Sequence, residues 1–210
     1  MFNNREEAGR ILAEKLVVEI KTKEGIVLAI PRGGIVIGKQ LSRKLNLPLD
    51  VLVTKKIPAP GNPELAIGAV GEEGIVFFDE QLCQSLCVTQ VYKKKIVEEK
   101  KKELEDKKIF FRKGKPPLDL KDKTVIITDD GVATGATMLA AIRVVKTQKP
   151  KEVIVAIPVV ALDTLPKLQA EADKVIYLEA PEMFFAVGQF YKEFNQVTDE
   201  EVINILNFKY

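Results

Sequence analysis

The stretch VIITDDGVATGAT, residues 125–137, carries most of the information about the fold and function of this chain. Its first residues are apolar and β-branched, which predicts a short buried strand. Two adjacent carboxylates, Asp129 and Asp130, come next. The small-residue loop Ala133-Thr134-Gly135-Ala136-Thr137 then leads directly into a helical pattern from Met138. The order is therefore strand, acid pair, glycine loop and helix.

This order predicts a site for a sugar phosphate. A loop at a helix N-terminus offers an anion backbone N–H groups and the helix dipole, and glycine lets the backbone approach a phosphate closely. The carboxylates would repel that phosphate, but they can accept hydrogen bonds from vicinal hydroxyls or share a divalent cation with phosphates. In the plainer alternative, the aspartates only end the strand, and Thr134 or Thr137 caps the helix.

The stretch resembles the signature of the type I phosphoribosyltransferases, which bind 5-phosphoribosyl-1-pyrophosphate (PRPP). The resemblance implies that Asp129 and Asp130 hold the ribose hydroxyls and contact Mg²⁺, directly or indirectly, while residues 133–137 wrap the 5-phosphate. It also implies an enzyme of nucleotide metabolism. This enzyme would transfer the phosphoribosyl group of PRPP to a nitrogen acceptor, a nucleobase or related heterocycle, with release of pyrophosphate.

A second glycine loop, Pro31-Arg32-Gly33-Gly34, also follows a predicted strand and precedes a helical pattern. Two glycines allow unusual backbone geometry, and the guanidinium of Arg32 suits bidentate phosphate contact. In the resembled family the matching loop binds pyrophosphate, often through a non-proline cis peptide, which would lie near Arg32-Gly33 here. A branch of the family whose members are uncharacterised shares this loop and is similar to nearly the whole chain. The alternative is an ordinary strand-to-helix turn.

Lys55 and Lys56 close a predicted strand over residues 51–54. We expect them to point into the same crevice and, with Arg32, to supply the positive charge that stabilises the departing pyrophosphate. Other family members place a lysine or arginine at this strand end. Four breakers, Pro58, Pro60, Gly61 and Pro63, then predict a long irregular segment. By the resemblance, residues 57–74 would be the flexible loop that closes over the site, although residues 65–70 and 75–78 also read as a hairpin.

Strands and helices alternate along the chain, which predicts an α/β fold with a parallel sheet flanked by helices. The expected strands cover residues 26–30, 51–54, 125–128, 153–157 and 175–178, with helices from 35 to 45 and near 162–172. Asn3 or Asn4 is expected to cap a first helix. We expect one phosphoribosyltransferase domain over residues 1–210, with its core at about 21–180 and a small hood at 181–210 to which the N-terminus contributes. Ligands of such sheets bind beyond the carboxyl ends of the strands, where both glycine loops fall.

The aromatic segment 181–191 follows the last core strand. It resembles the hood of 6-oxopurine phosphoribosyltransferases, which implies that Phe185 stacks on the acceptor. The alternative is that these aromatics only cover the sheet edge. Two departures argue against hypoxanthine or guanine as the acceptor. Ala133 stands where those enzymes carry an aspartate general base, and no lysine ends the strand at 153–157.

Composition excludes several other classes. With 32 Lys and Arg against 30 Asp and Glu, the net charge is +2, which demands neither nucleic acid nor membrane. No apolar run could span a bilayer, and the N-terminal residues do not match a signal peptide, so we expect a cytoplasmic protein. Cys83 and Cys87, four apart on a predicted helix, are expected to be free thiols, because the chain has no histidine to complete a zinc site.

The lysine-rich run 93–115 has interleaved acids, with Glu98–Lys102 and Glu103–Lys107 at helical spacing. It predicts a solvated, ion-paired helix, and a modest RNA contact is the open alternative. We expect PRPP and a small acceptor as ligands and a homodimer as the assembly. Two rival functions share the donor site. One is a non-catalytic, PRPP-sensing regulator that could bind RNA, and the other is a sugar-phosphate hydrolase.

Overall fold

The computed structural model describes residues 1–22, 24–113 and 116–207. Its α-helices are α1 (Arg5–Glu19), α2 (Gly34–Leu45), α3 (Glu80–Ser85), α4 (Gln90–Arg112), α5 (Ala136–Thr147), α6 (Leu165–Glu171) and α7 (Asp199–Asn207). Its strands are β1 (Gly25–Ala29), β2 (Leu49–Val51), β3 (Lys55–Ala59), β4 (Asn62–Val70), β5 (Val76–Phe78), β6 (Thr124–Thr128), β7 (Glu152–Val159) and β8 (Lys174–Glu179). Two short 3-10 helices, η1 (Glu72–Gly74) and η2 (Val187–Phe190), complete it.

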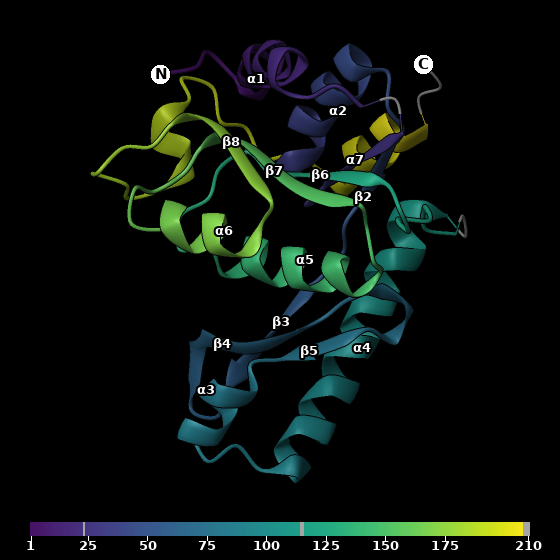
Figure 1. Cartoon of the computed structure of the whole chain (residues 1–210), viewed down its shortest axis with the longest axis vertical. Coiled ribbons are helices and arrows are strands. Elements are labelled where there is room, and N and C mark those ends of the chain that lie inside the picture. The colour runs from purple at the N-terminus through teal and green to yellow at the C-terminus, as the bar shows by residue number, and fades with distance from the viewer. Residues whose placement is uncertain (23, 114–115, 208–210) are drawn as a thin grey trace.

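The predicted α/β fold is confirmed. Five strands form one parallel sheet in the order β2-β1-β6-β7-β8. Helices α1 and α2 cover one face of this sheet, and α5 and α6 cover the other (Figure 1). Asn4 caps α1, as expected, because its side chain accepts a hydrogen bond from the backbone N–H of Glu7.

Alternate residues of the central strands pack on opposite faces, which explains why these strands read as continuous apolar runs. In β6, Val125 and Ile127 pack toward α5 and α6, whereas Ile126 packs toward α1 and α2. All three side chains are fully buried. At roughly 1.5–3 kcal/mol for burying each such side chain, the two-sided core is the main force that holds the sheet and its strand ends in place.

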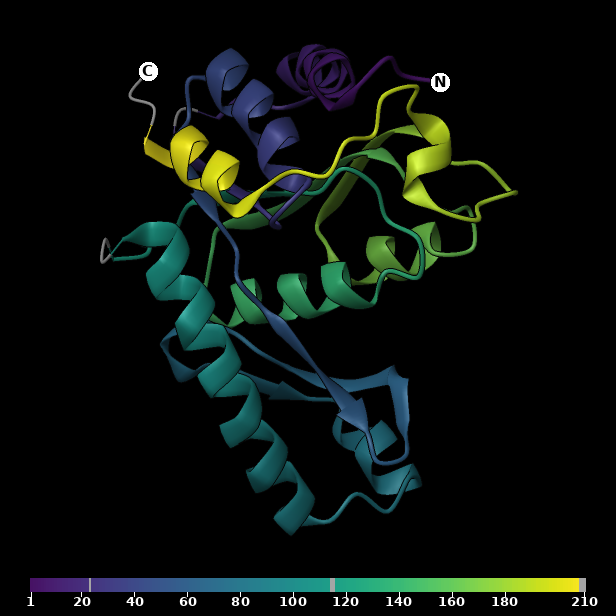
Figure 2. The same ribbon diagram turned by 180° about the vertical axis from the view of Figure 1, so that it is seen from behind.

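Residues 55–112 build a second lobe rather than the flexible loop that the sequence predicted. Strands β3, β4 and β5 form an antiparallel sheet, and α3 and the long α4 belong to the same lobe. The lobe projects away from the parallel sheet (Figure 2). The prediction that Pro58, Pro60, Gly61 and Pro63 prevent regular structure was wrong, because Pro58 lies within β3 and Pro63 within β4. β3 lies at the edge of its sheet, where Pro58 is tolerated, and the pairing shifts register on both sides of Pro58.

Several local predictions need smaller corrections. The second strand of the parallel sheet lies at Leu49–Val51, earlier than the 51–54 expected, and the helix near 162–172 is shortened to Leu165–Glu171. The hairpin of residues 65–70 and 75–78 is confirmed as β4 and β5. Both thiols are free, but α3 ends before Cys87, which has a φ of 52° and is exposed while Cys83 is buried. Burial raises the pKa of the Cys83 thiol.

The lysine-rich helix is confirmed as α4, but its ion pairs differ from those expected. Glu98 and Lys102 are both described and do not pair, and the side chain of Lys107 lies outside the described residues. Instead, Lys100 pairs with Glu103 at 2.6 Å, and Lys93 reaches Glu80 of α3 at 2.7 Å. None of the helices in the described ranges is both long enough and apolar enough to cross a membrane.

A buried ion cluster anchors the second lobe to the parallel sheet. Arg112, at the end of α4, donates from Nε to both carboxylate oxygens of Asp50 at 3.0 Å and from Nη2 to the carbonyl of Val51 at 2.8 Å. Its Nη1 pairs with Glu72 of η1. The side chain of Arg112 is only 5% exposed, so one cation pairs with two carboxylates that have little contact with water.

We predict that Arg112→Gln destabilises the fold by about 3–5 kcal/mol, because it leaves two buried carboxylates without a cation. Urea unfolding followed by circular dichroism measures this loss. Lys102→Gln removes the same charge from an exposed position of the same helix and should change the stability by less than about 0.5 kcal/mol. Equal effects of the two substitutions would contradict the assigned role of the cluster.

Candidate functional site

Parallel pairing of β1 with β6 brings the two glycine loops together. The last residues of the strands, Ala29 and Thr128, are register partners, and the N–H of Ile30 donates to the carbonyl of Thr128 at 2.9 Å. The loops that follow, 31–34 and 129–137, therefore leave the sheet side by side although about a hundred residues separate them. This is the carboxyl edge of the sheet, where the sequence predicted the ligand site.

Glycines in the first loop make room for the two carboxylates. A side chain at Gly33 would collide with the carboxylate of Asp130, and a Cβ at Gly34 would lie 2.9 Å from the Cα of Asp129. The structure thus brings together Gly33, Gly34, Asp129 and Asp130, as predicted. The cis peptide of this loop joins Pro31 to Arg32, one bond before the position that the resemblance implied.

The second loop ends at the N-terminus of α5. Gly135 takes a φ of 79° and caps the helix, so Ala136 and Thr137 form its first turn. Thr134 and Thr137 are exposed. The hydroxyl of Thr164 donates a hydrogen bond to the carbonyl of Ala133 at 2.6 Å. The loop therefore presents hydroxyls and the N–H groups of a helix N-terminus outward, which is the arrangement expected of a phosphate cradle.

The carboxyl pair lies in surroundings that disfavour two bare charges. Burial is the main cause that raises the pKa of Asp129 well above its usual range, and the adjacent charge of Asp130 raises it further. A hydrogen bond from the backbone N–H of Asp130 to Asp129 Oδ1, 2.8 Å long, has the opposite effect and lowers the pKa of Asp129. Groups that donate hydrogen bonds, or a cation, would therefore be stabilised beside these carboxylates.

Arg5 of α1 also belongs to the site, and sequence reasoning missed it. Its Nε donates to Asp130 Oδ2 at 2.7 Å, and Nη1 donates to the carbonyl of Asn195 at 2.7 Å. The guanidinium carbon stands 3.7 Å from the centre of the Phe194 ring. The residues around Arg5 form no pattern that predicts this role. Arg5 lies 125 residues from Asp130 in the chain, and only the tertiary fold brings the two side chains together.

Arg32 and the two predicted lysines, Lys55 and Lys56, lie in different parts of the structure. Arg32 lies at the loop as expected, and its guanidinium is 3.8 Å from Asp199 of α7, with both side chains more than 40% exposed. Lys55 and Lys56 do not end a strand of the parallel sheet, because they are the first two residues of β3 in the second lobe. The ammonium of Lys55 pairs with Glu103 of α4 at 2.8 Å. Their predicted contribution to the site stays a prediction.

The hood carries Phe185 on its surface. This side chain is 83% exposed, in the segment between β8 and η2 that projects from the molecule (Figure 2). The side chain of Gln189 shapes the segment, because it accepts from the N–H of Phe185 at 3.0 Å and donates to the carbonyl of Met183 at 3.0 Å. Hood and site are joined through Tyr191, whose hydroxyl donates to the carbonyl of Asp130 at 2.5 Å. Residues 2–3 of the N-terminus pair with residues 190–193.

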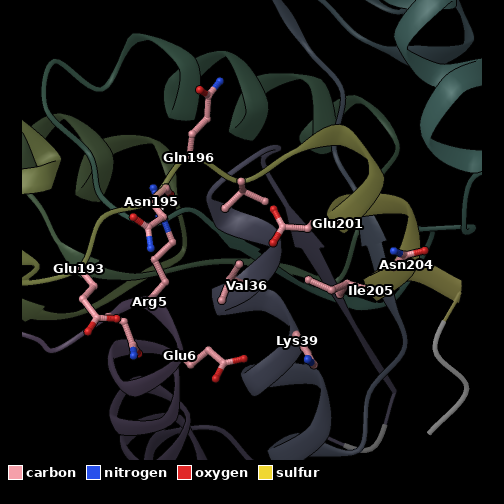
Figure 3. Close-up of a pocket in the computed structure, with 12 residues that line it drawn as sticks. Arg5, Glu6, Val36, Lys39, Glu193, Asn195, Gln196, Glu201, Asn204 and Ile205 are labelled. Atoms are coloured by element: carbon pink, nitrogen blue, oxygen red, sulfur yellow. Dashed lines mark hydrogen bonds between the residues drawn. The ribbon is translucent and has the colours of Figure 1, made fainter.

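A pocket of about 400 Å³ lies beside this site, between α1, α2 and α7 (Figure 3). Arg5 and Asn195 stand together at one side of it, with Glu201 opposite and Lys39 of α2 below (Figure 3). Asp129, Asp130 and residues 133–137 do not line the pocket. Arg5 is therefore the boundary between the pocket and the carboxyl pair.

The carboxyl pair fits a magnesium ion only if a ligand completes its coordination. Among the residues that the structure describes, no group of three or more acidic, cysteine or histidine side chains could hold a metal. Mg²⁺ keeps several waters and commonly binds through one or two carboxylates together with substrate phosphates. Asp129 and Asp130 match that type of site rather than a protein cage.

Comparisons with known proteins agree with the geometry. The family model described as a phosphoribosyl transferase domain matches residues 2–195. A Mycobacterium tuberculosis protein named "Putative phosphoribosyl transferase Rv0571c" is 35% identical over 207 residues, which is 99% of this chain and 46% of that protein. The chain thus spans about half the length of the curated relatives it matches.

Solved structures give the same fold. The Thermus thermophilus protein TT1426 is 38% identical, with a TM-score of 0.92 over 98% of this chain and 97% of that one. The Aquifex aeolicus protein AQ2163 is only 13% identical, and it matches 97% of this chain and 85% of its own with a TM-score of 0.54. The second likeness concerns the fold alone.

We predict that Gly135→Ala destabilises the protein more than Gly61→Ala. Both glycines have a positive φ, 79° and 74°, so both substitutions cost about 1–2 kcal/mol in backbone strain. At Gly61 nothing lies within 4 Å of the added methyl group, whereas at Gly135 the methyl would stand 2.7 Å from Thr164 Cγ2. Overpacking should add a further penalty of about 1–3 kcal/mol. Urea unfolding measures the difference, and equal losses would show that the loop is not packed as described.

Proposed function

Because the chain belongs to the phosphoribosyl transferase domain family, we propose that it transfers the phosphoribosyl group of PRPP to a nitrogen acceptor and releases pyrophosphate in an Mg²⁺-dependent reaction. The observation that carries the proposal is the meeting of three features at one sheet edge: the carboxyl pair Asp129–Asp130, the glycine loop 31–34 and the N-terminus of α5. A sugar with phosphates at both ends requires all three features at once.

Each part of PRPP is assigned to a part of this edge. Residues 133–137 bind the 5-phosphate, because their loop ends in the positive pole of α5. Asp129 and Asp130 accept hydrogen bonds from the ribose hydroxyls. The amides of Gly33 and Gly34 and the side chain of Arg32 bind the pyrophosphate. The pair of Arg32 with Asp199 is long and exposed, so its guanidinium can exchange that partner for a phosphate at little cost.

The chemistry then needs no nucleophilic side chain. The acceptor nitrogen forms a bond with the anomeric carbon as the bond from that carbon to the pyrophosphate oxygen breaks, and the nitrogen loses a proton. Bound Mg²⁺ would supply neutralisation of the charge on the leaving pyrophosphate. The carboxylates tolerate positive charge on the ribose ring, and Arg32 with the loop amides supplies preorganised positive potential beside the pyrophosphate.

The acceptor is a flat heterocycle in this proposal. Phe185 offers an exposed ring on the hood, and Tyr191 joins that hood to Asp130. Ala133 cannot act as a base, and no lysine stands at the end of β7 to recognise a purine oxygen. We therefore propose an acceptor other than hypoxanthine or guanine, whose proton leaves to solvent or to a group of the substrate.

We predict that Asp129→Asn with Asp130→Asn abolishes Mg²⁺-dependent PRPP binding, because neutral amides bind the cation poorly and change the hydrogen bonding to the hydroxyls. Titration calorimetry with and without Mg²⁺ measures the loss. Glu98→Gln with Asp106→Asn is the matched control, since it removes the same charge from exposed positions of α4. Unchanged binding in the Asp129–Asp130 variant would disprove the site.

The same titration separates the rival functions when it is followed by a panel of bases and an assay for pyrophosphate. Pyrophosphate release that requires a base supports the transferase. Tight PRPP binding without turnover of any base indicates a PRPP-sensing regulator. Release of pyrophosphate without an acceptor indicates a hydrolase.

We predict that Phe185→Ala raises the KM of the acceptor about tenfold and leaves the affinity for PRPP unchanged, since stacking of an aromatic ring on a base contributes about 1–3 kcal/mol. Steady-state kinetics with the best acceptor of the panel gives the KM, and calorimetry gives the PRPP affinity. Met183→Ala, at another exposed hood position, serves as the control. An unchanged KM in the Phe185 variant would show that this exposed ring does not stack on the acceptor.

A further inference from the structure

The side chain of Arg5 is fixed by three contacts. Its Nε donates to Asp130, its Nη1 donates to the carbonyl of Asn195, and its planar face lies on the ring of Phe194. The side chain is only 11% exposed. Arg5 belongs to α1, Asp130 follows β6, and Phe194 and Asn195 lie in the segment that leads to α7. Arg5 therefore connects three parts of the chain.

The two carboxylate oxygens of Asp130 have different hydrogen-bond partners. Oδ2 accepts from the Nε of Arg5, whereas no N–H group of the described residues donates to Oδ1, and the only other side chain in hydrogen-bonding contact with this carboxylate among the described residues is the neighbouring Asp129. The carboxylate also lies against the backbone of Gly33, where a side chain would collide with it. An ion pair on one oxygen and a close backbone on the same side fix the plane of the carboxylate, which leaves Oδ1 as its accepting oxygen.

We propose that Arg5 is a positioning residue of the donor site, which holds Asp130 by Oδ2 so that Oδ1 accepts a hydroxyl of the ribose. The proposal rests on the proposed function, because it assigns the ribose of PRPP to Asp130. A fixed carboxylate that needs no reorientation binds a pair of hydroxyls more tightly than a rotating one, since the ordering cost is already met in the folded chain.

A comparison with Arg32 argues that Arg5 acts through Asp130 rather than on a phosphate. Arg32 is 44% exposed and its ionic partner lies 3.8 Å away, so its guanidinium is available to an incoming anion. Arg5 has its ionic partner at 2.7 Å, a second hydrogen bond of the same length and a stacked ring. Moving Arg5 to a phosphate would break all three contacts and leave Asp130 without its cation.

A double-mutant cycle tests this assignment in the full-length chain. PRPP is titrated calorimetrically, with Mg²⁺ present, into the unmodified protein, Arg5→Gln, Asp130→Asn and the double variant. We expect Arg5→Gln to weaken binding about tenfold, and to cause no further loss once Asp130 is replaced, because coupled residues are not additive. Arg5→Lys should recover part of the affinity, since an ammonium can still pair with Asp130. Arg10→Gln, which removes the same charge from an exposed position of α1, should bind PRPP normally.

Titration with pyrophosphate alone distinguishes the two roles of a cation. Pyrophosphate has no ribose, so Arg5→Gln should bind it as the unmodified protein does, whereas Arg32→Gln should bind it more weakly. The inference is overturned if Arg5→Gln loses the same factor in both backgrounds of the cycle, or if it weakens pyrophosphate and PRPP equally. If the unmodified protein fails to bind PRPP, the proposed function fails and this inference fails with it. Normal PRPP binding by Arg5→Gln overturns the inference alone.

Discussion

The arrangement of the candidate site follows from the parallel pairing of β1 with β6. This pairing aligns Ala29 with Thr128, so the loops after both strands start at the same height at one edge of the sheet. It is maintained by side chains buried on both faces of the strands, with Val27 and Ile126 on one side and Leu28 and Ile127 on the other. A hydrophobic core formed by residues remote from the ligand thus sets the separation of the groups that would bind it.

Close packing at this edge leaves little freedom to the carboxyl pair. The glycines of the first loop bring backbone against Asp129 and Asp130, and Arg5 fixes one oxygen of Asp130. The two arginines at this edge have different surroundings, because Arg5 is enclosed by its partners and Arg32 is exposed. One sheet edge therefore combines a closely packed carboxyl pair with a more exposed cation, Arg32.

The second lobe obeys a separate constraint. Arg112 joins the end of α4 to Asp50 of β2 and to Glu72 of η1, so this lobe is bound to the sheet by charges that cannot separate without exposing an unpaired ion. The prolines within it are accommodated by an edge strand with irregular register. This explains why a stretch rich in chain breakers forms a sheet, and why Lys55 and Lys56 begin a strand of this lobe instead of ending one of the parallel sheet.

The parallel sheet, the two glycine loops and the carboxyl pair could all be predicted from the sequence, because each is encoded by neighbouring residues: apolar runs for the strands, glycines at the turns and two adjacent aspartates. The pairing of Arg5 with Asp130, the edge strand of residues 55–59 and the anchoring of the second lobe by Arg112 became visible only in the folded chain. The two ion pairs join residues far apart in the chain, and their strength depends on burial, which no local pattern of residues reveals. Strand β3 pairs with the neighbouring β4, but the prolines in and after it indicate a loop when the sequence is read alone.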